Sequence, residues 1–319
     1  MGGARNLLFV MCDQLRWDYL SCAGHPRLAT PNIDRLAACG VRFTNAFVQS
    51  PVCGPSRMSY YTGRYVMSHG SVWNFVPLPV GEPTLGDHLR PLGLRVAVAG
   101  KTHVAADAAG MARLGLSPDD VRGRAIAEGG FEPFDRDDGI YPPGFLDTPS
   151  RYFAFLRAQG YDGANPWHDF ANSAAGPDGE VLSGWAMRHA RLPARVREEH
   201  SETAYMTERA IEFIAEQGER PWCLHLSYIK PHWPYVAPAP YHALYGPDDV
   251  PPAKRSAEEL VDPHPVYAAF LDHPESVSFA KDEVRRTVIP TYMVSSGRST
   301  ITSAGCSRCW SGPGARPTR

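Results

Sequence analysis

Residues 53–64 of this 319-residue chain read Cys-Gly-Pro-Ser-Arg-Met-Ser-Tyr-Tyr-Thr-Gly-Arg, and this segment restricts its fold and chemistry more than any other. Pro55 fixes its own φ at about −65° and biases Gly54 away from the helical region, so the unfolded chain presents the thiol of Cys53 in an extended stretch. From Ser56 onward the segment can continue as a helix. Cys53 and Arg57 would then lie near a positive helix N-terminus, where anions bind. The alternative is a structural turn with a buried thiol.

The pattern Cys53-x-Pro55-Ser56-Arg57, followed by Thr62-Gly63-Arg64, resembles the signature of type I sulfatases and related phosphonate monoester hydrolases of the alkaline phosphatase superfamily. In that family the signature marks a cysteine for oxidation to formylglycine. The resemblance implies that the aldehyde at position 53 becomes the nucleophile, that Arg57 serves the finished site, and that a formylglycine-generating or other sulfatase-maturing enzyme acts on the chain. It also implies an α/β fold, an alkaline-phosphatase-like sandwich with a central, mostly parallel sheet flanked by helices.

An acidic residue follows the first apolar run of the chain. Residues 6–11 have the length of a strand and end at Cys12-Asp13-Gln14. Ligands of open α/β sheets collect at the carboxyl ends of strands, so Asp13 is placed to hold a hard divalent cation. An ordinary turn aspartate is the alternative. The family resemblance implies a metal site formed by Asp13, Gln14 and the oxidised Cys53, for Ca²⁺ or Mn²⁺ before Mg²⁺. The Asp-Gln form is similar to phosphonate monoester hydrolases and choline-sulfatase-type enzymes.

Two polar residues follow a second short strand. Residues 95–99, with β-branched Val96 and Val98, run through Gly100 into Lys101-Thr-His103. Residues two apart on an extended chain share a face, so Lys101 and His103 can both address one anionic sulfuryl group. The pattern resembles the Gly-Lys-x-His of sulfatases, whereas phosphonate monoester hydrolases carry Tyr and Thr at these places, so it favours sulfate esters. A solvated lysine and a capping histidine are the alternative.

A third apolar strand, residues 222–228, opens into a loop rich in Pro and aromatic residues. The loop resembles the His-bearing loop of the same family. The resemblance implies that His232 lies beside the leaving-group oxygen, with Lys230 nearby. Trp233 and Tyr235 are then expected to line the pocket for the organic part of the substrate.

Two further polar residues carry weaker indications. Asn74 matches an asparagine that contacts substrate in phosphonate monoester hydrolases, and an ordinary turn asparagine is an equal alternative. His225 lies inside the third strand and is expected to be a core or hydrogen-bonded histidine.

Composition predicts a soluble globular protein. The chain is 43% hydrophobic and 21% charged with a formal net charge of −2, which excludes a strongly basic nucleic-acid-binding protein. No apolar run approaches the ~20 residues of a membrane span, and only Met-Gly-Gly-Ala-Arg precedes the first strand. Seven cysteines without framework spacing fit reduced thiols. We therefore expect a cytoplasmic protein that acts on a small anionic ester, without nucleic-acid or membrane partners, and a homo-oligomer stays open.

The order of elements also predicts a parallel sheet, because strands and helices alternate along the chain. Residues 104–200 are rich in Gly, Pro, Arg and Asp and have weak periodicity, so we expect a loop-rich insertion over the active edge of the sheet. The remaining expected elements are strands at 6–11, 41–47, 95–99 and 222–228 and helices at 31–39, 84–92 and 201–217.

The C-terminal segment breaks this pattern. Residues 285–293 read as a family-like helix, but periodicity stops at Val294, so we expect the N-terminal part of a catalytic domain over 1–293 and a disordered, aberrant tail over 294–319. Back-translation with GC-rich codons, with one guanine restored after the codon of Met293, can yield the amphipathic sequence GLIGEVDDHLGRVLEVLERTGREADE. It resembles the helix that follows in the family. Our hypothesis is therefore a frameshift, and Cys306-x-x-Cys309 is then an accident of reading frame.

The rest of the family's metal site has no match in the sequence. The family completes that site with an Asp-His or Asp-Asn pair after a later strand, and Asp272-His273 follows no clear apolar strand. Asp13 and residue 53 alone would hold a hard cation weakly, because such cations take about six oxygen ligands. The fold is therefore expected to be incomplete at the C-terminus.

Three hypotheses follow. The first is a truncated hydrolase of sulfate or phosphonate esters with a formylglycine nucleophile. The second is an inactive or binding-only fragment of the same fold. The third is a related enzyme that uses unmodified Cys53 on phosphate esters.

Overall fold

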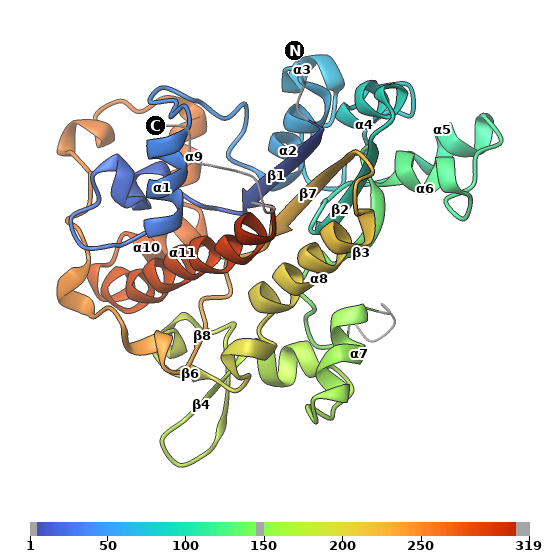
Figure 1. Ribbon diagram of the computed structural model, residues 1–319. Coiled ribbons are helices and arrows are strands. Elements are labelled where there is room, and N and C mark those ends of the chain that lie inside the picture. Colours follow the sequence, from blue (N-terminus) through green and yellow to red (C-terminus); the bar gives the residue numbers. More distant parts are fainter. Residues whose placement is uncertain (1–4, 145–149, 311–319) are drawn as a thin grey trace.

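The structure, a computed structural model, describes residues 5–144 and 150–310, and side chains for residues 5–144 and 150–298. Its centre is a sheet of four parallel strands in the order β1-β7-β2-β3 (Figure 1). The strands are β1 (Asn6–Cys12), β2 (Arg95–Gly100), β3 (Glu132–Arg136) and β7 (Trp222–Tyr228). The expected α/β fold with a parallel sheet is confirmed.

The sheet brings distant parts of the sequence to one edge. In the register, Cys12 lies beside Tyr228 and Gly100 lies beside Ser227, so β1, β7 and β2 end at the same level. Because the strands are parallel, the residues that follow them share the carboxyl edge of the sheet. Asp13, Lys101 and the loop after Tyr228 therefore meet there.

Helices cover both faces of this sheet. Side chains alternate along β2, so Ala97 and Ala99 face one core while Val96 and Val98 face the other. On the first face lie α7 (Arg151–Ala158) and α8 (Glu202–Gln217). Ser201 precedes α8, and its hydroxyl caps the N-terminus of the helix. On the second face lie α2 (Cys53–Thr62) and α4 (Leu85–Leu89).

The other elements surround this centre (Figure 1). A second sheet has the order β5-β4-β6-β8, formed by β4 (Ser173–Ala175), β5 (Val181–Ser183), β6 (Pro193–Ala194) and β8 (Ala237–Pro238). The remaining α-helices are α1 (Pro31–Cys39), α3 (Val66–His69), α5 (Ala108–Arg113), α6 (Val121–Ala127), α9 (Pro265–Leu271), α10 (Pro274–Phe279) and α11 (Asp282–Trp310).

Short helical turns join these elements. They are Trp17–Tyr19, Ser21–Ala23, Arg90–Leu92, Trp167–Ala171, Met187–His189, Glu198–His200, Tyr241–Ala243, Pro247–Asp249 and Ala257–Leu260.

Two expectations about the first 200 residues are wrong in detail. Residues 41–47 form no strand, because a strand needs a backbone partner and this segment has none among the described residues. Residues 104–200 are more than loops, since they contain β3, which extends the main sheet, α5 to α7, and most of the second sheet. Weak periodicity concealed β3 because it has only five residues.

The expected break at Val294 is also not present. Helix α11 continues past Met293 to Trp310, and Val294, Ser296 and Arg298 are buried. Arg298 donates to the hydroxyl of Ser201 at 2.9 Å and pairs with Glu198, so tertiary packing holds a stretch of poor helix propensity. Residues 311–319 of the expected tail lie outside the described residues. The frameshift concerns the gene and stays a prediction.

None of the helices in the described part of the chain combines the length and the apolar character needed to cross a bilayer.

Candidate active site

The site begins where β1 and β2 end beside β7. The backbone N–H of Asp13 donates to the carbonyl of Tyr228 at 3.0 Å, and that of Lys101 donates to the carbonyl of Ser227 at 3.1 Å. Gly100, the last residue of β2, has φ +105°, and a Cβ there would lie 2.0 Å from the backbone carbonyl oxygen of Ser227. Only glycine fits this close approach. Asp13 and Lys101 therefore directly follow the ends of β1 and β2, as the sequence predicts.

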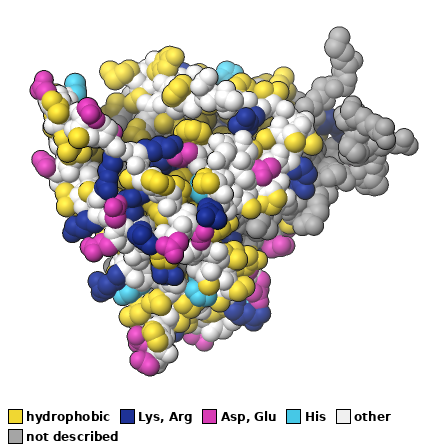
Figure 2. All heavy atoms as spheres, turned by 90° about the vertical axis from the view of Figure 1, so that its left-hand side faces the viewer, with side chains coloured by type: hydrophobic (Ala, Val, Ile, Leu, Met, Phe, Trp, Pro, Cys, Tyr) yellow, Lys and Arg dark blue, Asp and Glu magenta, His cyan; other side chains and the backbone are white. Residues whose placement is uncertain are grey.

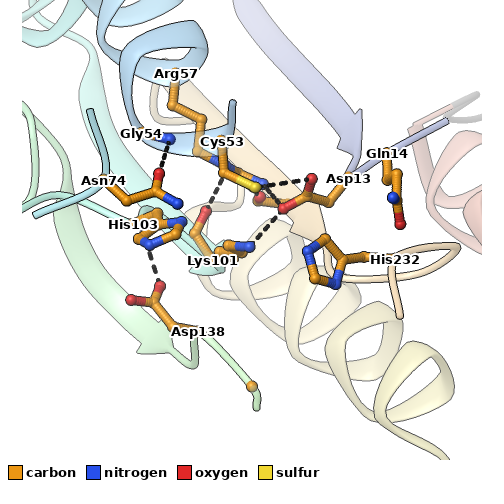
Figure 3. A network of polar contacts seen from close by, with 12 residues as sticks. Asp13, Gln14, Cys53, Gly54, Arg57, Asn74, Lys101, His103, Asp138 and His232 are labelled. Carbon is orange, nitrogen blue, oxygen red and sulfur yellow. Dashed lines mark hydrogen bonds and ion pairs between the residues drawn. The ribbon is translucent and has the colours of Figure 1, made fainter. Parts of the chain in front are cut away.

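Cys53 is the first residue of α2 and lies beside Asp13. Its Sγ is 3.6 Å from Oδ1 of Asp13. A residue outside α2 anchors its first turn, because the backbone N–H of Gly54 donates to Oδ1 of Asn74 at 2.7 Å. Asn74 thus positions the helix that carries Cys53, which is a more definite role than a turn asparagine (Figure 3).

Two cations hold the other oxygen of Asp13. Nζ of Lys101 is 2.6 Å and Nη2 of Arg57 is 3.2 Å from Oδ2 of Asp13, and all three side chains are at most 8% exposed. Arg57 also donates to the Lys101 carbonyl at 2.8 Å and to the Ser227 hydroxyl at 2.9 Å. Burial alone would raise the pKa of Asp13, but the charges of Lys101 and Arg57 outweigh it and hold that pKa well below its ordinary value.

His232 faces this group from the loop after β7 (Figure 3). One ligand atom each from Asp13, Cys53 and His232 lies within 4.8 Å of the others. Nδ1 of His232 hydrogen-bonds the carbonyl of Trp233, which makes Nδ1 the protonated nitrogen and leaves the lone pair on Nε2. Burial and the charge of Lys101 lower the pKa of His232, so the ring is neutral at pH 7.

His103 lies on the other side of Lys101. Its backbone has φ +54°, and the N–H groups of Thr102 and His103 both donate to Oδ1 of Asp138, at 3.0 and 3.1 Å. The ring of Phe75 packs edge-on against His103 with centroids 5.6 Å apart. Burial, with the charge of Lys101, lowers the pKa of His103 to about 4. His103 therefore contributes a neutral ring and not a cation.

Asp138 and Ser227 are site residues that sequence reasoning missed. Asp138 comes shortly after β3, so the rule that found Asp13 at a strand end could have indicated it once β3 was recognised. Ser227 lies inside β7 and carries no sequence signal, since only the register of β7 beside β2 brings its hydroxyl to Arg57.

The structure does not bring three expected residues to the cluster. The side-chain oxygen of Gln14 accepts from the backbone N–H of Trp233 at 3.2 Å and from the Tyr235 hydroxyl at 3.4 Å (Figure 3). Lys230 is half-buried, and its Nζ donates to the carbonyls of His232 and Pro234. Tyr235 is 7% exposed and packs in a core with Tyr292. Gln14, Lys230 and Tyr235 therefore support the loop that carries His232. Trp233, in the same loop, packs on Trp185 with ring centroids 4.6 Å apart.

The donor set fits part of a site for a divalent cation. Oδ1 of Asp13 and the side chain at position 53 point at each other, and Asp13 is kept ionised. In the described part of the chain, Asp13 is the single carboxylate of the group formed with Cys53 and His232. Hard cations bind several carboxylate oxygens. The group can therefore supply part of a metal site. The metal site of Asp13, Gln14 and residue 53 that the sequence indicates stays a prediction.

The state of Cys53 separates two of the hypotheses. Burial and the Asp13 carboxylate raise the pKa of Cys53 against the opposing charges of Lys101 and Arg57. The unmodified side chain is thus a neutral thiol at pH 7, and a thiol is a much weaker nucleophile than a thiolate. This disfavours unmodified Cys53 as the nucleophile.

Comparisons with known proteins find several relatives of this chain. A protein of Trinickia caryophylli, "Multifunctional alkaline phosphatase superfamily protein PehA", is 32% identical over 284 residues, which are 86% of this chain and 51% of that protein. A choline-sulfatase of Rhizobium meliloti is 27% identical over 76% of this chain and 41% of its own length. The structure of a phosphonate monoester hydrolase of Agrobacterium radiobacter superposes with a TM-score of 0.77 and 25% identity, covering 97% of this chain and 60% of that one.

The chain therefore spans about half the length of the curated relatives that it matches. The profile of the sulfatase family matches residues 5–272. The strand-end aspartate, the cysteine at the start of α2 and the lysine and histidine after β2 lie within that range. This chain belongs to the sulfatase family.

Proposed function

We propose that this chain carries the nucleophile-bearing part of a hydrolase of sulfate esters, in which a maturing enzyme converts Cys53 to formylglycine. The observation that carries the proposal is the position of Cys53, 3.6 Å from an Asp13 carboxylate that Lys101 and Arg57 hold from its other side. Two buried cations beside a nucleophile at a helix start suit an anionic ester. Burial of these charges lowers stability, so the cluster would be unfavourable if residues 53–57 formed only a structural turn.

Each residue has a role that follows from its environment. Formylglycine hydrate would supply the hydroxyl nucleophile, and a divalent cation held by Asp13 and residue 53 would supply positive charge beside it. Lys101 and Arg57 offset the negative charge that develops on the sulfuryl oxygens. His103, neutral at pH 7, can hydrogen-bond one of these oxygens, and Asp138 fixes the turn that presents it.

His232 acts on the leaving group. Its Nδ1 is engaged by Trp233, so Nε2 is the nitrogen that can face the ester oxygen. A bound anionic ester raises the pKa of the ring, because a nearby negative charge favours the protonated form. The imidazolium can then donate a proton from Nε2 to the departing alcohol.

Hydrolysis of phosphonate or phosphate mono- or diesters is the second candidate. The likeness to solved phosphonate monoester hydrolases favours it, with TM-scores of 0.75 and 0.77. Lys101 and His103 favour sulfate, since those enzymes resemble this chain at Asp13-Gln14 but carry other residues at these two places. The same proposal includes Ca²⁺ or Mn²⁺, in preference to Mg²⁺, as the natural metal. It also includes a maturing enzyme that acts on the chain and a cytoplasmic location.

Two measurements test the proposal. The chain is coexpressed with a formylglycine-generating enzyme, and the tryptic peptide that spans Cys53 is weighed. A loss of mass that matches thiol-to-aldehyde conversion is expected, and a fully intact thiol contradicts the proposal. Hydrolysis of 4-nitrophenyl sulfate and of 4-nitrophenyl phenylphosphonate is then followed with and without added Ca²⁺ or Mn²⁺, with Cys53→Ala as the control.

The activity assay compares this chain with a version in which the reading frame after Met293 is restored. We expect metal-dependent sulfate hydrolysis by the restored version and none by the 319-residue chain, because the latter has a partial metal site. Robust turnover by the 319-residue chain contradicts the frameshift hypothesis. Faster phosphonate than sulfate hydrolysis by the restored version favours the second candidate.

A further inference from the structure

The turn that carries His103 has an uncommon backbone conformation. His103 has φ +54°, a left-handed value that few residues other than glycine adopt. Nδ1 of its ring is buried and has no hydrogen-bond partner in the described part of the chain, so this nitrogen does not fix the direction of the ring. The direction depends on the backbone of the turn and on the edge-on contact with Phe75. The contacts that hold this turn therefore also hold the ring.

One carboxylate holds the backbone of the turn. The N–H groups of Thr102 and His103 both donate to Oδ1 of Asp138, which lies beside His103 in Figure 3. A strained backbone conformation persists only where the surrounding structure over-determines it. The position of Asp138 must therefore be fixed in turn.

Arg136 joins Asp138 to a second carboxylate. Nη2 of Arg136 donates to Oδ2 of Asp138 at 2.7 Å, and its Nε donates to Oε2 of Glu128 at 3.2 Å. Arg136 is the last residue of β3, whereas Glu128 directly follows α6. Because a guanidinium is a planar, rigid fork of donors, it fixes the two carboxylates relative to each other.

Glu128 leads back to the same turn. The hydroxyl of Thr102 donates to Oε2 of Glu128 at 2.5 Å, and Thr102 is fully buried. Thr102 is thus held by Asp138 through its N–H and by Glu128 through its hydroxyl, while Arg136 connects these two carboxylates. We call this closed set of contacts among Thr102, Glu128, Arg136 and Asp138 the Thr102 ring. The exposed surface of the molecule in Figure 2 gives no comparable anchor, since charged side chains there are scattered over it.

We propose that Arg136 is a positioning residue of the active site, which acts through the Thr102 ring to fix the turn that presents His103 to the ester. Its charge has a second effect, because it offsets the charge of Asp138, which would otherwise draw a proton to His103. Arg136 therefore determines the place of the imidazole and affects its proton affinity. The contact of His103 with an ester rests on the proposed function, whereas the action of Arg136 on His103 does not.

NMR of the 319-residue chain with isotope-labelled histidine tests the proposal. The His103 signals, identified with His103→Gln, are followed between pH 7.5 and 5. The charged groups that act on this ring are Lys101, Asp138, Arg57 and Asp13. In Arg136→Gln, at least about 3-fold more of the His103 ring should be protonated at pH 5, because Asp138 has lost its counter-charge. The amides of Thr102 and His103 should exchange about 10-fold faster, since their acceptor is no longer fixed.

Arg95→Gln is the matched control. The side chain of Arg95 is 31% exposed against 33% for Arg136, and it also faces two carboxylates, those of Glu132 and Glu216. Arg95 is the first residue of β2, so it lies at the end of the sheet away from the active site. This variant should leave the protonation of His103 and both amides unchanged.

Two further variants separate charge from geometry. Arg136→Lys keeps the charge without the planar fork, so it should restore the protonation of His103 and only part of the amide protection. Thr102→Val removes the hydroxyl bond to Glu128 and no charge. It should speed the exchange of the His103 amide and leave the protonation of the ring unchanged.

Two results overturn the inference. One is an Arg136→Gln chain in which the protonation of His103 and the exchange of both amides match the unaltered chain. The other is Arg95→Gln with changes as large as those of Arg136→Gln, which assigns the effect to general loss of stability. If Arg136→Gln does not fold, unaltered amide exchange in both Arg136→Lys and Thr102→Val overturns it. None of these measures hydrolysis, so the inference can fail while the proposed function stands.

Discussion

The carboxyl end of β1 and its free edge are opposite kinds of environment within one strand. At the end of the strand, Asp13 is 8% exposed and paired with two cations that are each 2% exposed. Along the edge, Leu7 and Val10 are exposed although they are apolar. The strand is thus tightly packed at its carboxyl end and open to solvent along its outer edge.

This difference shows which parts of the fold the chain determines by itself. The charged cluster draws on β1, α2 and the end of β2, which all lie within the first 101 residues, and on the register with β7. The free edge of β1 and residues 41–48 have no strand partner among the described residues. The following changes test how separate the two regions are, from the largest expected effect to the smallest.

Asp13→Ala should have the largest effect on stability. It leaves the buried charges of Lys101 and Arg57 without a counter-charge, which costs about 3–5 kcal/mol of unfolding free energy. Urea unfolding followed by circular dichroism measures it. Asp248→Ala is the control, because its pair with Arg286 is solvent-exposed and should be worth about 0–1 kcal/mol. Similar losses for the two variants would show that the cluster is not closed to water.

Gly100→Ala should break the junction of β2, β7 and Lys101. The new Cβ would lie 2.0 Å from the carbonyl oxygen of Ser227, and the backbone has φ +105°. Steric overlap and the strained φ together should cost about 3 kcal/mol. Gly93→Ala is the control, since Gly93 has φ +85° but nothing within 4 Å, and it should cost about 1 kcal/mol. Equal losses in urea unfolding would contradict the close approach of β2 to β7.

Much of the site could be predicted because strand ends are visible in sequence. Short apolar runs that end at Asp13 and at Lys101 can meet only at one edge if the sheet is parallel. The strand order could not be predicted, since β7 inserts between β1 and β2 from more than 120 residues further along the chain. For the same reason the contact of Ser227 with Arg57 had no sequence signal.

The differences between the expectations from sequence and the structure have physical causes. The side chain of Gln14 turns to the loop at Trp233 and Tyr235, and no local pattern reveals so distant a partner. Helix α11 continues through Val294 because packing outweighs weak helix propensity. Residues 41–47 have the alternation of a strand but lack the neighbour that a strand needs. Local pattern therefore predicts what a segment can form, and tertiary contacts decide whether it does.

His225 gives the central strand a pH dependence that the open edge lacks. It is fully buried in β7, stacks on Phe9 and contacts the Tyr61 hydroxyl. Burial lowers the pKa of His225 to about 3, from an ordinary value of 6.5. The unfolded chain therefore binds one more proton between these values, and stability falls as the pH is lowered from about 6.5 toward 3.

The slope for this one proton is about 1.4 kcal/mol per pH unit. Urea unfolding at pH 7, 6, 5 and 4 measures it. His225→Gln should be less stable at pH 7 and should lose this part of the slope, whereas His88→Gln at an exposed position should keep it. An unchanged slope in His225→Gln would contradict a buried neutral imidazole.

Phe43→Ser should have the smallest effect on stability, under about 0.5 kcal/mol, because the side chain is 79% exposed and loses little contact. Its effect on association should be larger, since removal of an exposed aromatic ring lowers apolar surface that promotes aggregation. Light scattering on heating and binding of an apolar dye should both decrease. Phe131→Ser, in a core position with 0% exposure, should instead cost several kcal/mol. If Phe43→Ser destabilised the chain nearly as much as Phe131→Ser, residues 41–48 would already be packed in the isolated protein. The free side of β1 would then be closed by the chain itself, and the contrast between the carboxyl end and the free edge of this strand would disappear.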